Sequence, residues 1–355
     1  MALARTYLYR FPHFCSSFLS PPIQVSFLHH SVTSLLPPIH THIISSFATT
    51  SPSLPTPQAP PSSSSSMLPK HDHSSGRCWK PMCLYFTQGK CTKMDDPIHL
   101  EKFNHNCSMD LQVNADDIEH KRSQDFDFFL VLDLEGKVEI LEYPVLVLDA
   151  KTMDIVDFFH RFVRPTAMSE QRINQYIEGK YGKFGVNRVW HDTALPFKEV
   201  LLQFEAWLTQ HQLWTKESVG PLNRAAFITC GDWDLKTKVP EQCKVSMMKL
   251  PPYFMEWINL KDAYSNFYGT EVSGMRTMLN HSNIPLLGSH HLGIDDTKNI
   301  ARVLQRMLSD GAVMQITAWR SPDSQKVRFA FKDGSSSSSC HQNKSKRFLK
   351  GNRFI

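Results

Sequence analysis

Residues 128–135 have the sequence FFLVLDLE, five apolar residues in succession followed by two carboxylates two positions apart. An unbroken apolar run of this length, closed by charge and by Gly136, is typical of a buried strand. Residues two apart on a strand project to the same face, so Asp133 and Glu135 are expected to point the same way. Two carboxylates at the end of a buried element repel each other and lose hydration unless a cation offsets them. The stretch therefore predicts a cation site at the end of a buried strand.

Residues 126–333 continue with alternating strand and helix patterns. Short apolar runs bounded by charge, glycine or proline predict further strands, at residues 143–148, 155–163, 225–229, 313–318 and 327–331. Apolar residues recur at helical spacing in two longer segments and predict helices, at residues 197–207 and 295–308. This order of strands and helices indicates an α/β domain in which a mixed β-sheet is flanked by helices.

Two later segments also place acidic side chains at the ends of regular elements. Asp232 and Asp234 follow a predicted strand in the run GDWD. The run HLGIDD, residues 291–296, leads into the last predicted helix and puts Asp296 in its first turn. Asp295, at the start of the same helix, is more simply explained as an N-cap. Each segment alone is weak evidence for a site, whereas their combined order is specific.

That order is Asp-x-Glu on a first strand, Asp after a later strand, and His-x-x-x-x-Asp entering a helix. It resembles the DEDDh superfamily of 3′→5′ exonucleases, and most closely the Eri-type (enhanced-RNAi) 3′ exoribonucleases of plants. The resemblance covers about residues 126–331, and the blocks that carry it include residues 129–135, 229–234, 251–259 and 291–302. It implies an RNase-H-like fold for the domain.

The resemblance also implies roles for five side chains, Asp133, Glu135, Asp234, Asp296 and His291. The four carboxylates would hold two Mg²⁺ or Mn²⁺ ions, because hard cations prefer carboxylate oxygen. Such a pair would stabilise both the attacking water and the leaving 3′ oxygen, and His291 would act as general base on that water. The expected reaction releases 5′-nucleoside monophosphates one at a time from single-stranded RNA 3′ ends. Asp232 is the alternative to Asp234, and His290 is the alternative to His291.

Residues 77–107, called the finger below, contain four of the eight cysteines of the chain, interleaved with histidines. The spacing suits a tetrahedral Zn²⁺ site made of Cys83, Cys91, His99 and His105. Cys78 and Cys107 are further candidates, so the ligand set stays open. Residues 97–105 resemble the second half of a poly(ADP-ribose)-binding-type zinc finger. A unit of this size has too small an apolar core to fold without its metal, and the alternative is a loosely packed Cys/His-rich linker.

The two ends of the chain have compositions unsuited to a folded core. Residues 1–66 contain no Asp, Glu or Lys and are rich in Ser and Pro, which predicts a transit peptide for the chloroplast, with the mitochondrion or a cytoplasmic tail as alternatives. Residues 334–355 form a Ser-rich and then basic tail, and residues 108–125 a polar linker, predicted to be helical at 116–122. The net charge of +5 does not by itself indicate nucleic acid. No stretch is long and apolar enough for a membrane span.

The leading prediction is therefore a metal-dependent 3′→5′ exoribonuclease, acting in organellar rRNA or small-RNA processing. One alternative is a catalytically silent protein that binds RNA or ADP-ribose through the finger. The other is a DNA 3′ exonuclease, because carboxylates that hold metal ions at a phosphate do not read the 2′-hydroxyl.

Overall fold

A computed structural model describes residues 79–106, 111, 120–217 and 220–331. These all fall within one unit of the chain, Asp72–Ile355. The predicted transit peptide, the basic tail and most of the predicted linker helix lie outside the described residues; residues 120–122, its described end, are not helical. None of the helices in the described part of the chain is long and apolar enough to cross a membrane.

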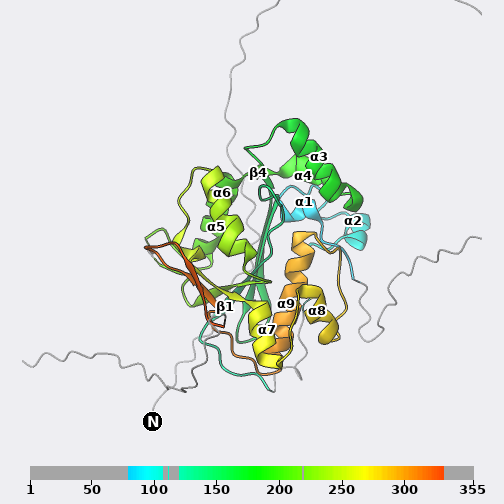
Figure 1. Ribbon diagram of the computed structural model, residues 1–355. Helices are drawn as coiled ribbons and strands as arrows, with labels where there is room; N and C mark the ends of the chain where they lie inside the picture. Colours follow the sequence, from blue (N-terminus) through cyan, green and yellow to red (C-terminus); the bar gives the residue numbers. More distant parts are fainter. Residues whose placement is uncertain (1–78, 107–110, 112–119, 218–219, 332–355) are drawn as a thin grey trace, which may run out of the picture. The chain divides into compact units, whose positions relative to one another are not determined.

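The described strands form one mixed sheet in the order β4-β3-β2-β1-β5-β6-β7-β8 (Figure 1). The strands are β1 (Phe128–Leu132), β2 (Glu142–Asp149), β3 (Ile155–Arg164), β4 (Leu195–Pro196), β5 (Ala225–Thr229), β6 (Glu256–Asn259), β7 (Ala318–Arg320) and β8 (Val327–Phe329). β1 pairs antiparallel with β2 and parallel with β5, in a register that sets Leu132 beside Thr229. The carboxyl ends of β1 and β5 therefore meet at one edge of the sheet, which brings together the acidic segments that follow them.

Helices cover both faces of the sheet (Figure 1). They are α3 (Glu170–Tyr181), α4 (Asn187–Thr193), α5 (Phe197–Gln210), α6 (Val239–Val245), α7 (Leu260–Tyr268), α8 (Met275–His281) and α9 (Gly293–Ser309). Phe129 and Val131 of β1 pack in a cluster with α7, α8 and α9, while Leu130 and Leu132 pack on the other face with α5. Apolar burial on both faces explains why β1 is an unbroken apolar run. The predicted mixed sheet flanked by helices is confirmed.

Several element boundaries differ from the predictions, and two of the differences change the surroundings of named residues. The strand predicted at residues 313–318 begins only at Ala318, because the backbone before it bonds to a side chain: Gln124 donates to Ala312 O and accepts from Met314 N. The last helix begins at Gly293, two residues before the predicted start. Asp295 is therefore inside the first turn rather than at the N-cap, and its Oδ2 accepts a hydrogen bond from Ser289 N at 2.8 Å.

The described part of the finger contains two short helices, α1 (Leu84–Thr87) and α2 (Pro97–Lys102). Asp96 caps α2, because its Oδ1 accepts hydrogen bonds from two backbone N–H groups of the first turn. A backbone bridge between Met82 and Asn104 closes the unit. α1 contacts α4 and β3, so the finger packs against the α/β domain (Figure 1).

Candidate active site

The two acids after β1 lie beside an acid from the start of α9. One carboxylate oxygen from each of Asp133, Glu135 and Asp296 falls within 4.8 Å of the other two. Gly293 permits the close approach of α9, because a Cβ at this position would lie 3.1 Å from both Asp133 O and the carboxylate carbon of Glu142. The site thus joins the carboxyl end of a buried strand to the first turn of a helix.

Asp234 lies against the same stretch of chain. It opens a π-helical segment (Asp234–Lys238) after β5, and its Oδ1 accepts a hydrogen bond from Leu134 N at 3.0 Å. The alternative acid, Asp232, instead accepts a hydrogen bond from the Trp257 indole at 3.2 Å. The geometry therefore brings Asp234, rather than Asp232, to the chain that carries Asp133 and Glu135.

The four carboxylates form a site that strongly disfavours negative charge in the absence of a cation. Burial raises the pKa of Glu135, of Asp234 and of Asp296, each to about 7. Burial, followed by repulsion from Asp234 and Asp296, raises the pKa of Asp133 well above its ordinary value. Several buried carboxylates with converging oxygens are a donor set suited to divalent cations such as Mg²⁺, which would offset the repulsion. The residues therefore fit the metal ions that the family resemblance implies.

Two adjacent histidines lie at the entrance to α9. Nδ1 of His290 is 3.1 Å from both carboxylate oxygens of Asp296, whereas His291 donates its backbone N–H to Asp296 Oδ2 at 2.8 Å. The two rings stack with centroids 3.9 Å apart. Partial burial, together with the positive charges of Lys180 and nearby basic side chains, lowers the pKa of both imidazoles, which favours their neutral, proton-accepting form. A ring nitrogen of each histidine lies within 4.8 Å of a carboxylate oxygen of Asp296, so the structure places both candidate bases at this acid.

A fifth buried carboxylate, Glu142, was missed by the sequence analysis. Its two oxygens accept the backbone N–H groups of Gly293 at 3.0 Å and Ile294 at 2.9 Å, at the start of α9. His160 Nε2 at 3.1 Å and the Tyr181 hydroxyl at 3.1 Å complete its surroundings. The pairing with His160 keeps the pKa of Glu142 low despite full burial. In the sequence, the one indication of this site is that an acidic residue directly precedes the apolar run at residues 143–148.

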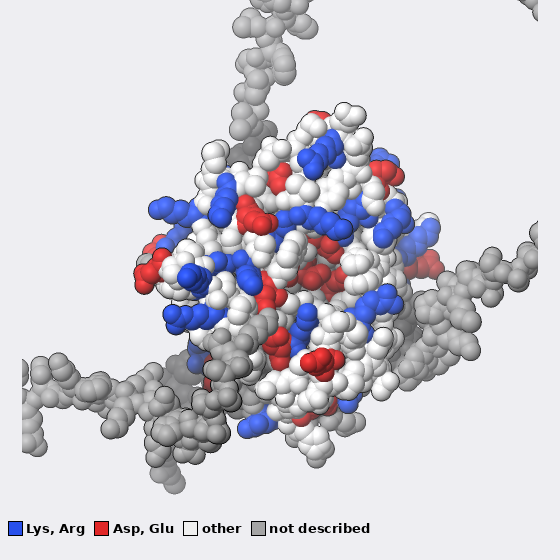
Figure 2. Space-filling model, viewed as in Figure 1, with Lys and Arg blue, Asp and Glu red and all other residues white. Residues whose placement is uncertain are grey.

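Lys180 is the second residue that the sequence analysis missed. Its Nζ lies 2.6 Å from Glu135 Oε2, and both side chains are largely buried. Lys183 and Arg276 also act on the site, because their charges help to lower the pKa of His291. Figure 2 shows acidic side chains gathered near the middle of this face, with Lys and Arg side chains around them. A cationic surround of this kind suits a polyanionic ligand.

In the finger, the four predicted ligands also converge. Single ligand atoms of Cys83, Cys91, His99 and His105 all lie within 4.8 Å of one another. The Nε2 atoms of His99 and His105 are 3.0 Å apart, and Cys91 Sγ lies 3.5 Å from the first and 3.8 Å from the second. Cys78 and Cys107 lie outside the described residues.

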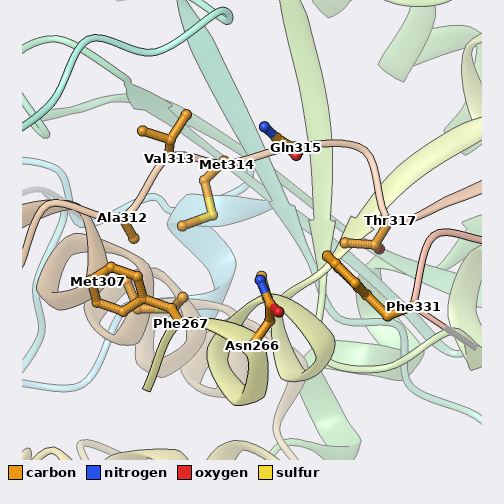
Figure 3. A pocket seen from close by; sticks show the side chains of 10 residues that line it. Asn266, Phe267, Met307, Ala312, Val313, Met314, Gln315, Thr317 and Phe331 are labelled. Atoms are coloured by element: carbon orange, nitrogen blue, oxygen red, sulfur yellow. The ribbon is translucent and has the colours of Figure 1, made fainter. Parts of the chain in front are cut away.

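A pocket of about 80 Å³ lies away from both clusters, near the carboxyl end of α9 (Figure 3). Phe267 of α7, Met307 of α9 and Val313 line it, with Phe331 at its side. None of its lining residues is a carboxylate, a histidine or a cysteine. It therefore offers no catalytic or metal-binding group, and the chemistry of the described residues concentrates at the two clusters.

Comparison with known proteins agrees with this geometry. The family model RNase_T, described as exonuclease, matches residues 129–304. An uncharacterised exonuclease domain-containing protein of Arabidopsis thaliana is 67% identical over 256 residues, which cover 72% of this chain and 76% of that protein. ERI1 exoribonuclease 3 of Bos taurus is 31% identical over 204 residues, covering 55% of this chain and 58% of that protein.

Among solved structures, a 3′-exonuclease described in 3′-end-specific recognition of the histone mRNA stem-loop is 28% identical. It matches with a TM-score of 0.50 and covers 58% of this chain and 92% of that chain. The region matched by the family model, residues 129–304, includes the acids after β1, Asp234 and the first turn of α9. The chain belongs to the exonuclease family and, within it, to the DEDDh 3′→5′ exonucleases of the Eri type.

Proposed function

We propose that this protein is a 3′→5′ exoribonuclease that removes 5′-nucleoside monophosphates from single-stranded RNA ends. The observation that carries the proposal is the convergence of carboxylate oxygens from Asp133, Glu135 and Asp296 within 4.8 Å, with Asp234 beside them. Relatives named as exoribonucleases support RNA as the substrate. Divalent ions held by these carboxylates would supply charge stabilisation at the attacking and leaving oxygens of the scissile phosphate.

The side chains around the acids have distinct parts in this proposal. His291, a ring nitrogen of which lies within 4.8 Å of a carboxylate oxygen of Asp296, is the general base that takes the proton of the attacking water. Partial burial lowers the pKa of its imidazole, which favours the neutral, proton-accepting form. Lys180, Lys183 and Arg276 provide the positive potential that attracts the RNA phosphates. Lys180 also limits the repulsion on Glu135, with which it forms an ion pair.

The test is incubation of the full-length protein with matched RNA and DNA oligomers labelled at the 5′ end. Mg²⁺, Mn²⁺ and a chelator are compared for each substrate. The proposal expects RNA to shorten one nucleotide at a time from its 3′ end with metal and to stay intact with chelator. Equal or faster loss of DNA would make the protein a DNA exonuclease. No nucleotide release with either metal would favour the silent binding protein that acts through the finger.

We further propose that the finger binds one Zn²⁺ ion through Cys83, Cys91, His99 and His105. Two thiolates and two imidazoles are a donor set typical of structural Zn²⁺, and their ligand atoms already converge. A closed set of four protein ligands leaves no position for water or substrate. The zinc is therefore a structural ion rather than a catalytic one.

The transit-peptide prediction leads to a proposal about location and substrate. Residues 1–66 combine abundant Ser with the absence of Asp, Glu and Lys, which supports import into the chloroplast and an organellar RNA substrate such as rRNA or small RNA. A fluorescent protein fused after residue 66 should accumulate in chloroplasts. Cytoplasmic or mitochondrial fluorescence would overturn the location, and unaltered organellar rRNA 3′ ends in a loss-of-function line would overturn the rRNA substrate.

A further inference from the structure

The first helix of the finger links the Cys/His cluster to the nuclease sheet. Cys83, one of the four cluster residues, precedes α1, and its carbonyl accepts the backbone N–H of Thr87 at 3.1 Å. Phe86 of the same helix stacks on the His105 ring with centroids 4.4 Å apart. A metal held by Cys83 and His105 would therefore fix α1 in two places. Cys83 precedes its first residue, and the Phe86 side chain stacks on His105.

The end of α1 completes an open edge of the sheet. Among the described residues, β3 has a strand partner on the side away from β2 only at Val163 and Arg164. Before that point the finger supplies the partners: Gln88 Nε2 donates to His160 O at 3.2 Å, and Gln88 Oε1 accepts Phe162 N at 3.0 Å. The bond from Phe162 N satisfies a buried backbone donor on this edge, and His160 O accepts a second hydrogen bond from Arg161 Nη1 at 2.8 Å.

Thr87, the last residue of α1, contacts a buried side chain of the sheet. Its Oγ1 lies 2.7 Å from Nδ1 of His160, a side chain with no exposed surface. The other ring nitrogen of His160 lies 3.1 Å from Glu142 Oε1, so the two contacts together fix the orientation of the imidazole. Glu142 in turn accepts the backbone N–H groups of Gly293 and Ile294, which begin the helix that carries Asp296.

We propose that the zinc-loaded finger is a positioning element of the nuclease site. Thr87 and Gln88 orient His160, His160 orients Glu142, and Glu142 fixes the first turn of α9 so that Asp296 meets Asp133 and Glu135. This inference rests on the proposed exonuclease function for its activity readout. It gives the finger a role in catalysis that requires no contact with RNA.

The test uses three single substitutions in the full-length, zinc-loaded protein. Thr87→Val removes the hydroxyl and keeps the side-chain shape, whereas Thr87→Ser keeps the hydroxyl. Tyr85→Phe is the matched control, because the Tyr85 hydroxyl bonds to Asp192 on α4, at the same contact surface but outside the chain of contacts to Glu142. Nucleotide release from a 5′-labelled RNA gives kcat and KM, and electron paramagnetic resonance gives the affinity for Mn²⁺.

The expected result is that Thr87→Val lowers kcat about tenfold and weakens Mn²⁺ binding, with KM and zinc content unchanged, as for other residues that orient metal ligands. Thr87→Ser and Tyr85→Phe should behave like the wild type. A Thr87→Val protein with wild-type kcat and Mn²⁺ affinity would overturn the inference. If the wild type releases no nucleotide, the proposed function fails, but the Mn²⁺ affinities still decide this inference.

Hydrogen exchange provides a second measurement that does not depend on how a variant folds. Zinc is removed from the wild-type finger by a zinc-selective chelator in buffer without other divalent ions, and exchange is followed at the amides of Gly293 and Ile294, which bond to Glu142. The inference predicts faster exchange at these two amides after zinc loss, with α5 unchanged. Equal exchange before and after zinc loss would contradict it.

Discussion

The two clusters of candidate metal ligands differ in how the chain assembles them. The Cys/His cluster is local, because all four of its residues lie between Cys83 and His105. The carboxylate cluster joins the end of β1, the start of the π-helical segment and the first turn of α9. Basic side chains, among them Lys180, Lys183 and Arg276, surround the carboxylate cluster. A structural zinc site has no need of such charges, because it binds no anionic ligand. The comparison indicates that an ion in the finger would organise the fold, whereas ions at the carboxylates would act on a ligand.

The largest loss of activity is expected for a substitution of Asp296, and a much smaller one for its neighbour Asp295 in the first turn of α9. Asp296→Asn should lower nucleotide release about 1000-fold, corresponding to about 4 kcal/mol of lost charge stabilisation, while RNA binding persists. Asp295→Asn is the matched control, because Asp295 bonds to Ser289 N and its asparagine can still accept that bond. Rates and filter binding are measured for both. Similar rates for the two variants would remove Asp296 from the site.

The next effect distinguishes the two histidines beside the acids. His291→Ala should reduce kcat about 100-fold, the range expected for the loss of a general base. His290→Ala should lower kcat less, because a metal ion held by the carboxylates would replace the contact of His290 with Asp296. Single-turnover rates at several pH values provide the comparison. A greater loss of kcat for His290→Ala than for His291→Ala would show that His290 is the general base.

A smaller effect on activity is expected from the finger. Elemental analysis of the wild type should find about one equivalent of zinc per chain, and Cys91→Ala should abolish it. The same substitution should lower kcat about tenfold through the altered orientation of Glu142. The carboxylates are intact in this variant, so some activity should remain at high Mg²⁺. Cys243→Ala, in the core and outside the finger, is the control for loss of a buried thiol. Retention of zinc by Cys91→Ala would contradict the proposed ligand set.

The smallest effect concerns stability without metal. Burial raises the pKa of Asp234 to about 7, so the folded state retains a proton that the unfolded state releases at about pH 4. Asp234 therefore costs no stability below pH 4, and its contribution to the stability of the wild type falls as the pH rises from about 4 to about 7. At pH 8 without metal, Asp234→Asn should melt at least about 2 °C above the wild type, a shift equivalent to about 1 kcal/mol.

This difference between Asp234→Asn and the wild type should shrink at pH 5, where Asp234 is largely protonated, and should reverse when saturating Mg²⁺ is added. Asp232→Asn is the control, since Asp232 bonds to Trp257 outside the cluster. Melting by circular dichroism at pH 5 and pH 8 gives the comparison. A wild type that is more stable than Asp234→Asn at pH 8 without metal would show that the carboxylates do not repel as described.

The sequence alone predicted most strands and the acids that follow them, because their signals are local. The run from Phe128 to Leu132 is buried on both faces, and its end fixes where Asp133 lies. Glu142 could not be assigned in this way, since its partner Gly293 lies 151 residues further along the chain. The strand predicted at residues 313–318 was mostly wrong for a similar reason, because the distant side chain of Gln124 holds that backbone.

Binding of Mn²⁺ tests the central claim most directly. Electron paramagnetic resonance counts the ions bound by the zinc-loaded wild type and by the Asp133→Asn, Glu135→Gln double variant, which keeps side-chain shape and removes two charges. The account predicts two Mn²⁺ ions per wild-type chain and a loss of tight binding in the variant. Equal stoichiometry and affinity in the two proteins would show that the acids at the end of β1 do not hold the ions.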